Sequence, residues 1–328
     1  MLDLVNKSYT FPDGVTITII QIKQRDDGYW VTYNTGKDNS VPRKQTMPYD
    51  EFMGIFLICL NKNMSNYKIN LSHAEILIKC DEIAKKYQFI HDLFANGLVN
   101  CTHRHYGRSL TYTFHIAELC GYDEFDIIEF GVGPVPRGLI DFKNLINIIQ
   151  EQAKTNFKVN IFGFDRNEGM PAPSSYKDHP EIWNEKLWGI EPLTHINAPF
   201  AKIYDGDLDS MIKEYSNNLY KTSSKIGFIS FDLDQYQGTK IATEILKIDS
   251  KFLFPCLPMY WDDLYDTPLM SEFSGPGLAL DEFNQENSLR KIDTKKFAIG
   301  TTAFLQVLDH PMRTQQEKPL YPLYLRNF

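Results

Sequence analysis

Residues 126–142 read DIIEFGVGPVPRGLIDF, an apolar strand followed by a glycine-rich turn and the start of a helix. Glycines in such a turn, here including Gly131 and Gly133, let a ligand approach the backbone closely. Glu129 stands just before the turn, where it would repel a pyrophosphate but can accept a hydrogen bond from an amino group or a hydroxyl. This stretch therefore favours a ligand that carries a charged amino acid over a dinucleotide.

Two further predicted strands also lead to acids. The strand over 159–164 is followed by Asp165, at the position where a carboxylate accepts both ribose hydroxyls of an adenosine ligand. The next strand leads to Asp207, which we expect to receive the adenine amino group. Acids in this order match the parts of S-adenosylmethionine, although a helix cap is the competing explanation for an acid after a strand. The expected cofactor contacts are Glu129, Gly131, Gly133, Asp165 and Asp207.

Four carboxylates follow the next two predicted strands. Asp232 and Asp234 come directly after one of them, and Asp262 and Asp263 come after the other. Because ligands of open α/β sheets bind at the carboxyl ends of the strands, these acids should converge. They would repel one another unless a cation is present, and Mg²⁺ prefers such oxygen ligands. Two separate, solvated acidic loop ends are the alternative interpretation.

A different chemistry is suggested by Tyr236 and Lys240, with Ser223 shortly before them in the chain. This set imitates the Tyr/Lys/Ser arrangement of short-chain dehydrogenases, in which the Lys lowers the pKa of the Tyr. The chain lacks a G-x-G-x-x-G turn that would receive the pyrophosphate of NAD(P). An NAD(P)-dependent oxidoreductase is therefore the second hypothesis.

From residue 126 onward, short apolar runs alternate with helical patterns. This alternation predicts an α/β fold with a mostly parallel, Rossmann-like sheet and helices on both faces. The domain is expected to span 71–328, with 71–121 as a helical lead-in whose last helix starts at Thr111. The predicted strands are 127–130, 159–164, 200–204, 226–231, 257–261 and 297–308.

Residues 1–70 are predicted to form a separate small α+β unit. The stretch 16–33 has the pattern of a hairpin, and Pro48 with the acids after it is typical of a helix start. Aromatic residues make up 13% of the chain, and several, such as Tyr29 and Trp30, lie in the hairpin or in loops rather than in core strands. Aromatic side chains in such places stack on sugars or line subunit interfaces, so we expect a saccharide or small-molecule acceptor and a homo-oligomer.

Composition narrows the possible partners and compartments. Lys and Arg number 34 against 42 Asp and Glu, a formal net charge of -8, so nucleic acid and anionic membranes are not expected partners. The five cysteines are widely spaced and never form a C-x-x-C pair, which disfavours a disulfide framework and a zinc site. The chain shows no targeting segment and no apolar stretch of membrane-spanning length, and we expect a cytoplasmic protein.

Four segments, in the same order, resemble the macrocin O-methyltransferase family. Residues 163–171, GFDRNEGMP, resemble its F-D-x-F-E-G-L-P segment, and residues 232–239, DLDQYQGT, are similar to its D-x-D-L-Y-x-S-T. Asp262 and Asp263 stand where the family has its D-D-Y pair, and residues 277–283, GLALDEF, look like its downstream G-x-x-x-A-x-D-E-F helix.

The resemblance implies a Mg²⁺-dependent class I methyltransferase that modifies sugar hydroxyls. It implies a seven-stranded sheet whose last strand is antiparallel and lies around 297–308. Glu129, Gly131 and Asp165 would hold S-adenosylmethionine by this comparison. The metal would be held by Asp232, Asp262 and Asp263, and Asp234 would be the general base. A non-catalytic relative that keeps the fold as a binding or assembly module is a third hypothesis.

Overall fold

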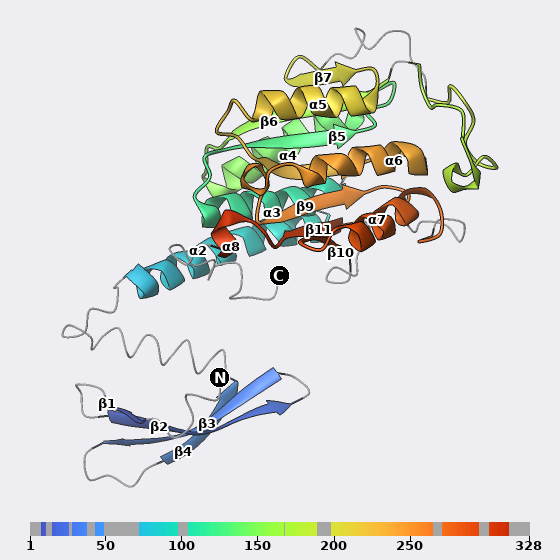
Figure 1. Cartoon of the computed structure of the whole chain (residues 1–328). Helices are drawn as coiled ribbons and strands as arrows, with labels where there is room; N and C mark the ends of the chain where they lie inside the picture. The colour runs from blue at the N-terminus through green and yellow to red at the C-terminus, as the bar shows by residue number, and fades with distance from the viewer. Residues whose placement is uncertain are drawn as a thin grey trace. The chain divides into compact units, whose positions relative to one another are not determined.

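The structure is a computed structural model in which the chain divides into two compact units, 1–79 and 80–328 (Figure 1). The division falls inside the first described helix, α2 (Ser72–Ala95), a little later than the predicted boundary. The described residues are 8–10, 15–25, 28–37, 43–48, 72–97, 104–166, 168–188, 198–264, 271–294 and 302–314.

The first unit contains a four-stranded antiparallel sheet with strand order β1-β2-β3-β4. The predicted hairpin corresponds to β2 and β3, which pair from Val15↔Lys37 to Arg25↔Gly28. Pro48 is the last residue of β4 rather than a helix start, and the helix predicted after it lies outside the described residues. The strand bounds are β1 (Ser8–Thr10), β2 (Val15–Arg25), β3 (Gly28–Lys37) and β4 (Arg43–Pro48).

The second unit is an α/β fold built on a seven-stranded, mostly parallel sheet, as predicted. The strand order is β10-β11-β9-β8-β5-β6-β7. The five adjacent strands β9, β8, β5, β6 and β7 pair in parallel, with β7 at one edge of the sheet, whereas β11 is antiparallel to both of its neighbours. The bounds are β5 (Glu124–Phe130), β6 (Lys158–Asp165), β7 (Ala201–Asp205), β8 (Ile226–Phe231), β9 (Cys256–Trp261), β10 (Arg290–Asp293) and β11 (Thr302–Val307).

Helices cover both faces of this sheet, with α3 and α4 on one face and α5, α6 and α7 on the other (Figure 1). All six residues of β8 are buried, because a central strand is covered on both sides. No helix in the described ranges is long and apolar enough to cross a bilayer. The remaining helices are α3 (Arg104–Cys120), α4 (Arg137–Ala153), α5 (Leu208–Leu219), α6 (Tyr236–Ala242), α7 (Gly275–Glu286) and α8 (Pro311–Thr314), with short 3₁₀ turns η2 (Tyr176–Asp178), η4 (Thr243–Lys247) and η5 (Ser250–Phe252).

The lead-in helices pack onto the second unit through apolar stripes. The described part of α2 buries Ile83, Tyr87, Ile90 and Phe94, which recur at helical spacing. Helix α3 begins at Arg104, earlier than the predicted start at Thr111. This correction matters because the added first turn lies in the core beside the sheet, next to the site described below.

Candidate functional site

The loops after four parallel strands meet at one edge of the sheet. Gly131 N–H donates to the carbonyl of Phe164 at 2.9 Å, and Asp232 N–H donates to that of Phe130 at 2.9 Å. Asp262 N–H donates to the carbonyl of Phe231, also at 2.9 Å. The carboxyl ends of β6, β5, β8 and β9 are thus joined side by side. The predicted site residues that follow these strands therefore lie along the same side of the sheet, where the parallel strands end.

The glycine turn after β5 uses its two glycines differently. Gly131 has φ +85°, and a Cβ there would lie 1.8 Å from the carbonyl oxygen of Asp232, so no other residue fits between the two strand ends. Gly133 has φ +67°, and a Cβ there would meet nothing within 4 Å. The turn therefore closes tightly against β8 at Gly131 and stays open at Gly133, where a ligand can approach the backbone.

Asp165, at the end of β6, holds the glycine turn in place. Its Oδ2 accepts hydrogen bonds from the N–H groups of Val132 (2.7 Å) and Gly133 (2.6 Å), and Oδ1 accepts from Arg166 N–H (2.6 Å). Burial nevertheless raises the pKa of this carboxyl group. These bonds give Asp165 a structural task that the sequence analysis did not foresee, in addition to the ribose contact predicted for it.

Glu129, the penultimate residue of β5, is buried with an incomplete set of partners. Its side chain lies under the start of α4, where a Cβ on Gly138 would be 1.8 Å from Oε1. Tyr106 O–H donates to Oε1 at 3.2 Å, whereas Oε2 has no hydrogen-bond partner. Burial, with smaller contributions from Asp165 and Asp141, raises the pKa of Glu129 to about 8. Glu129 is only 2% exposed, so its side chain lies away from bulk solvent.

Asp126, a second buried acid on β5, differs from Glu129 in that both of its carboxyl oxygens have hydrogen-bond partners. Asp126 accepts hydrogen bonds at Oδ1 from Asn160 (2.9 Å) and Ser224 (2.5 Å), and at Oδ2 from Tyr215 O–H (2.7 Å). Both oxygens are therefore paired within the protein. Because buried carboxylates are normally paired, the orphan oxygen of Glu129 makes the carboxyl end of β5 a candidate place for a ligand to bind.

Asp207 caps α5. Its Oδ2 accepts from the N–H of Ser210 at 3.0 Å and from its hydroxyl at 2.8 Å, and these bonds lower the pKa of Asp207. The acid that ends β7 is Asp205, which is opposite Asp165 in the strand pairing. Asp207 is thus a helix cap, as the competing explanation held, and its contact with adenine stays a prediction.

The three predicted metal ligands and the predicted general base lie in two pairs. The carboxyl group of Asp232 is within hydrogen-bonding reach of Asp262, and that of Asp234 is within reach of Asp263. Burial and these neighbouring acids raise the pKa of Asp232 well above its usual range and that of Asp234 to about 8. Tyr260 O–H also donates to Oδ1 of Asp262 at 2.6 Å.

This arrangement has the donor chemistry for a hard cation but not a finished ligand set. Carboxylate oxygens are the ligands that Mg²⁺ prefers, and mutual repulsion is what a cation would relieve. Within the part of the chain that the structure describes, however, no three Asp, Glu, His or Cys side chains are grouped closely enough to hold a metal ion.

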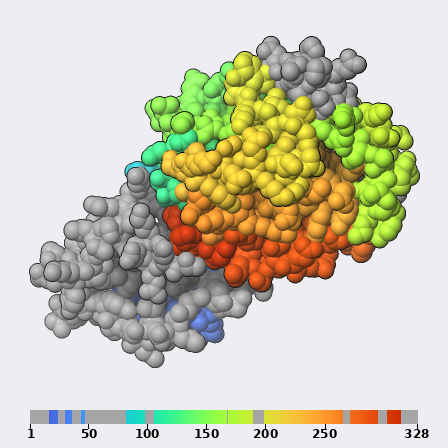
Figure 2. Space-filling view, turned by 45° about the horizontal axis from the view of Figure 1, so that its top comes forward, coloured from blue at the N-terminus to red at the C-terminus, as the bar shows by residue number. Residues whose placement is uncertain are grey.

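The segment between β6 and β7, residues 168–188, crosses from the glycine-turn side to the carboxylate side. Gln235 Nε2 donates to the carbonyl of Pro171 at 3.0 Å, and Gln237 N–H at the start of α6 donates to Oδ1 of Asp178 at 2.9 Å. Lys177 forms an ion pair with Glu282 of α7 at 3.3 Å. Figure 2 shows this segment, in yellow-green, beside the orange helices α6 and α7. It borders the site, although the sequence analysis assigned it no such role.

Tyr236 and Lys240, the pair that imitates short-chain dehydrogenases, bond to acids of α7. Tyr236 O–H donates to Glu282 at 2.7 Å, and Lys240 forms ion pairs with Glu282 (3.0 Å) and Glu286 (2.7 Å). Burial and the bond to Glu282 raise the pKa of Tyr236, the opposite of what proton transfer by such a tyrosine requires. These residues join α6 to α7.

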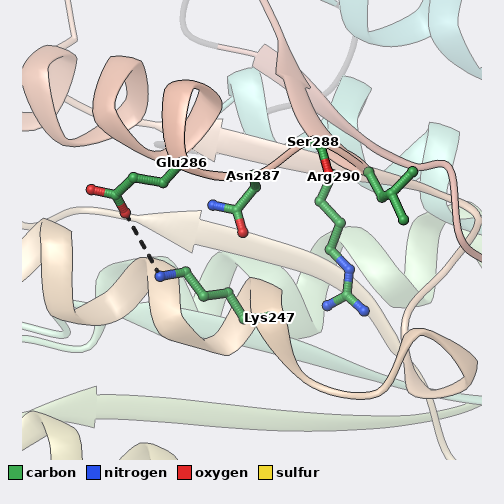
Figure 3. Close-up of a pocket in the computed structure, with 6 residues that line it drawn as sticks. Lys247, Glu286, Asn287, Ser288 and Arg290 are labelled. Carbon is green, nitrogen blue, oxygen red and sulfur yellow. Dashed lines mark ion pairs between the residues drawn. The ribbon is translucent and has the colours of Figure 1, made fainter.

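A polar hollow lies at the opposite edge of the sheet (Figure 3). Arg290 starts β10 and is paired with Val307, whose N–H bonds to Pro255 just before β9, so this edge is where β9 begins. The Arg290 guanidinium is already bonded to backbone carbonyls and to Asp309, so it does not offer an anion site. The hollow is lined by Lys247, Glu286, Asn287, Ser288, Leu289 and Arg290.

Tyr106 is the site residue that the sequence analysis missed. The sequence predicts that the last lead-in helix starts at Thr111, yet Tyr106, Leu110 and Phe114 recur at intervals of four and are all buried. That helical spacing was the signal in the sequence that could have identified Tyr106.

No protein-family model matches the chain, and no curated protein matches it in sequence.

Proposed function

We propose that the protein is an S-adenosylmethionine-dependent, Mg²⁺-dependent O-methyltransferase that acts on a hydroxyl of a sugar or a glycosylated natural product. The observation that carries the proposal is the orphan Oε2 of Glu129 beside the open glycine turn. The reversed strand β11 supports it, because a seven-stranded sheet with an antiparallel last strand is what the resemblance to class I methyltransferases implies.

The ammonium group of S-adenosylmethionine would supply what Glu129 lacks. It brings a hydrogen-bond donor for Oε2 and a positive charge that favours the ionised carboxylate over the neutral form. A dinucleotide offers a pyrophosphate at this position, which the same carboxylate repels. Asp165 would meet the ribose and Asp207 the adenine, in the order in which β6 and β7 follow β5 in the sheet.

The acidic pairs would serve the acceptor. Asp232, Asp262 and Asp263 would hold Mg²⁺, which acidifies a hydroxyl when it is bound. Asp234 takes the proton from the acceptor hydroxyl as general base. The acceptor oxygen forms its bond to the methyl carbon as the sulfur–methyl bond breaks, leaving a methyl ether and S-adenosylhomocysteine. Charge is neutralised in this step, so positioning contributes more than charge stabilisation. We place the protein in the cytoplasm, as a homo-oligomer.

The test compares the two cofactor classes on one protein. S-adenosylhomocysteine should raise the melting temperature and bind in calorimetry, whereas NADP should do neither. Glu129→Gln should lose most of that binding, because a neutral amide does not attract the ammonium group. Asp126→Asn is the matched control: it should lower stability, since it disturbs a fully bonded buried acid, yet leave binding intact.

Three results would decide against the proposal or refine it. Binding of NADP in place of S-adenosylhomocysteine would favour the oxidoreductase, and binding of neither would favour a non-catalytic module. Binding without methyl transfer in the presence of Mg²⁺, to a panel of sugars and glycosides, would contradict the acceptor class. Asp232→Asn should keep cofactor binding and lose turnover.

A further inference from the structure

The first turn of α3 brings a tyrosine to the carboxylate that the proposed function assigns to the cofactor. Tyr106 O–H donates to Oε1 of Glu129 at 3.2 Å, and Ser230 Oγ of β8 donates to the phenol oxygen at 3.3 Å. We propose that Tyr106 is a positioning residue, which holds one oxygen of Glu129 so that the other faces the ammonium group of the cofactor. This inference rests on the proposed function.

The hydrogen bonds define which way the phenol proton points. Ser230 donates to the phenol oxygen, so the single phenol proton is directed at Glu129. An ionised carboxylate accepts at both oxygens, and a bond to a charged acceptor is stronger than a neutral one. Tyr106 therefore favours the ionised form of Glu129 and occupies only Oε1, which leaves Oε2 for the ligand.

The tyrosine ring has little freedom to move. It is 1% exposed, and its centroid lies 4.7 Å from that of Phe142 and 5.0 Å from that of Tyr260, with His105 at 4.6 Å. These contacts come from α4, β9 and α3, and His105 and Tyr260 also stack on each other with centroids 4.2 Å apart. The packing fixes the hydroxyl, so the Glu129 carboxylate is oriented before any cofactor arrives, which lowers the entropic cost of binding.

An ordinary structural role is the competing explanation, and the same strand provides a matched example of it. Tyr215 O–H donates to the buried Asp126 at 2.7 Å, near the amino end of β5. Asp126 has every oxygen paired within the protein, so Tyr215 only stabilises the fold. Tyr106 differs because its acid keeps an orphan oxygen at the ligand-binding end of the strand.

The experiment uses two ligands that differ in the amino-acid part. S-adenosylhomocysteine carries the ammonium group, whereas 5′-methylthioadenosine lacks it and keeps the adenosine. In the full-length protein, Tyr106→Phe should weaken S-adenosylhomocysteine about tenfold, as expected for one hydrogen bond to a charged group, and leave 5′-methylthioadenosine unchanged. Tyr215→Phe should lower the melting temperature and leave the affinity ratio of the two ligands unchanged.

Two further variants, the double variant of Tyr106 with Glu129 and the single variant Ser230→Ala, complete the test. Tyr106→Phe combined with Glu129→Gln should weaken S-adenosylhomocysteine no further than Glu129→Gln alone, since Tyr106 acts through that acid. If Tyr106→Phe fails to fold, Ser230→Ala should shift the ratio in the same direction by a smaller factor. An unchanged ratio in the folded variant overturns the inference. Absence of S-adenosylhomocysteine binding to the wild-type protein overturns the proposed function instead.

Discussion

His91 on α2 illustrates what a single buried side chain does to stability. It is 9% exposed, its ring centroid lies 4.1 Å from that of Tyr112, and neither ring nitrogen has a hydrogen-bond partner. Burial, with help from His115 and Arg108, lowers its pKa to about 3. The imidazole is therefore neutral in the folded protein at any ordinary pH, and it brings two unsatisfied polar atoms into an apolar contact.

His91→Leu should stabilise the protein, and more so at acid pH. At pH 8 the gain is about 1 kcal/mol, because two unsatisfied atoms are removed at similar volume. Below about pH 6.5, His91 becomes protonated in the unfolded wild-type chain but stays neutral in the folded protein. The free energy of unfolding of the wild type therefore decreases as the pH falls toward 3. The variant lacks this loss, and its advantage in urea unfolding should be larger at pH 5.5 than at pH 8.

His310→Leu is the control, since its pKa is also lowered, to about 4. Its Nε2 contacts the carbonyl of Leu253 at 3.1 Å, and Met312 N–H donates to Nδ1 at 3.1 Å. Removing this partnered ring should destabilise the protein at pH 8. A loss of stability in His91→Leu at both pH values would contradict the first prediction.

Differences in burial explain why the sequence predicts the strand β8 but not the strands β10 and β4. β8 has its predicted bounds, because a strand covered on both faces must be apolar along its length. β10 and β4 were missed: RKID and RKQTMP are polar, and each lies at the edge of its sheet. The start of α3 was missed because polar residues in its first turn obscured the helical spacing of Tyr106 and Leu110.

Site residues at strand ends were predictable, but their partners were not. The topology alone places Glu129, Asp165, Asp232 and Asp262 at one edge, because parallel strands end together. That Asp165 binds the glycine turn, or that Asp178 reaches α6, depends on contacts across 32 or more residues of chain. Periodicity carries no information about such contacts.

The buried Asp178 is one of the residues that hold the segment 168–188 to the start of α6. Asp178 is 1% exposed and accepts from Ser174 N–H (2.9 Å), Ser174 Oγ (2.7 Å) and Gln237 N–H (2.9 Å). Asp178→Asn keeps the size but replaces one acceptor oxygen with a donor, so one of these bonds is lost, at about 1 kcal/mol. Amides of residues 174–183 should then exchange hydrogen faster in mass spectrometry, while the affinity for S-adenosylhomocysteine stays unchanged.

The exposed Asp209 on α5 offers the control for this prediction. It forms an ion pair with Lys213 on the helix surface, so Asp209→Asn should leave exchange in 174–183 as it is in the wild type. Equal exchange in Asp178→Asn and wild type would show that this acid does not anchor the segment.

For the whole molecule, the acidic edge of the sheet links metal binding to global stability. Folding brings Asp232 close to Asp262 and Asp234 close to Asp263, and burial together with these neighbouring acids raises the pKa values of Asp232 and Asp234. The unfolded chain has no such cluster. A hard divalent cation should therefore bind the folded state preferentially, and at about 100 times its Kd it should raise the melting temperature by about 5 °C.

Differential scanning calorimetry with MgCl₂, and with NaCl at the same ionic strength, separates specific binding from screening, because NaCl weakens repulsion between exposed charges only. Asp232→Asn removes one of the carboxyl groups proposed to bind the cation, so it should abolish the Mg²⁺ shift. Asp209→Asn should keep the full shift. An equal shift with NaCl would show that the acidic pairs do not bind Mg²⁺ specifically, and a full shift in Asp232→Asn would show that Asp232 is not a ligand of the cation.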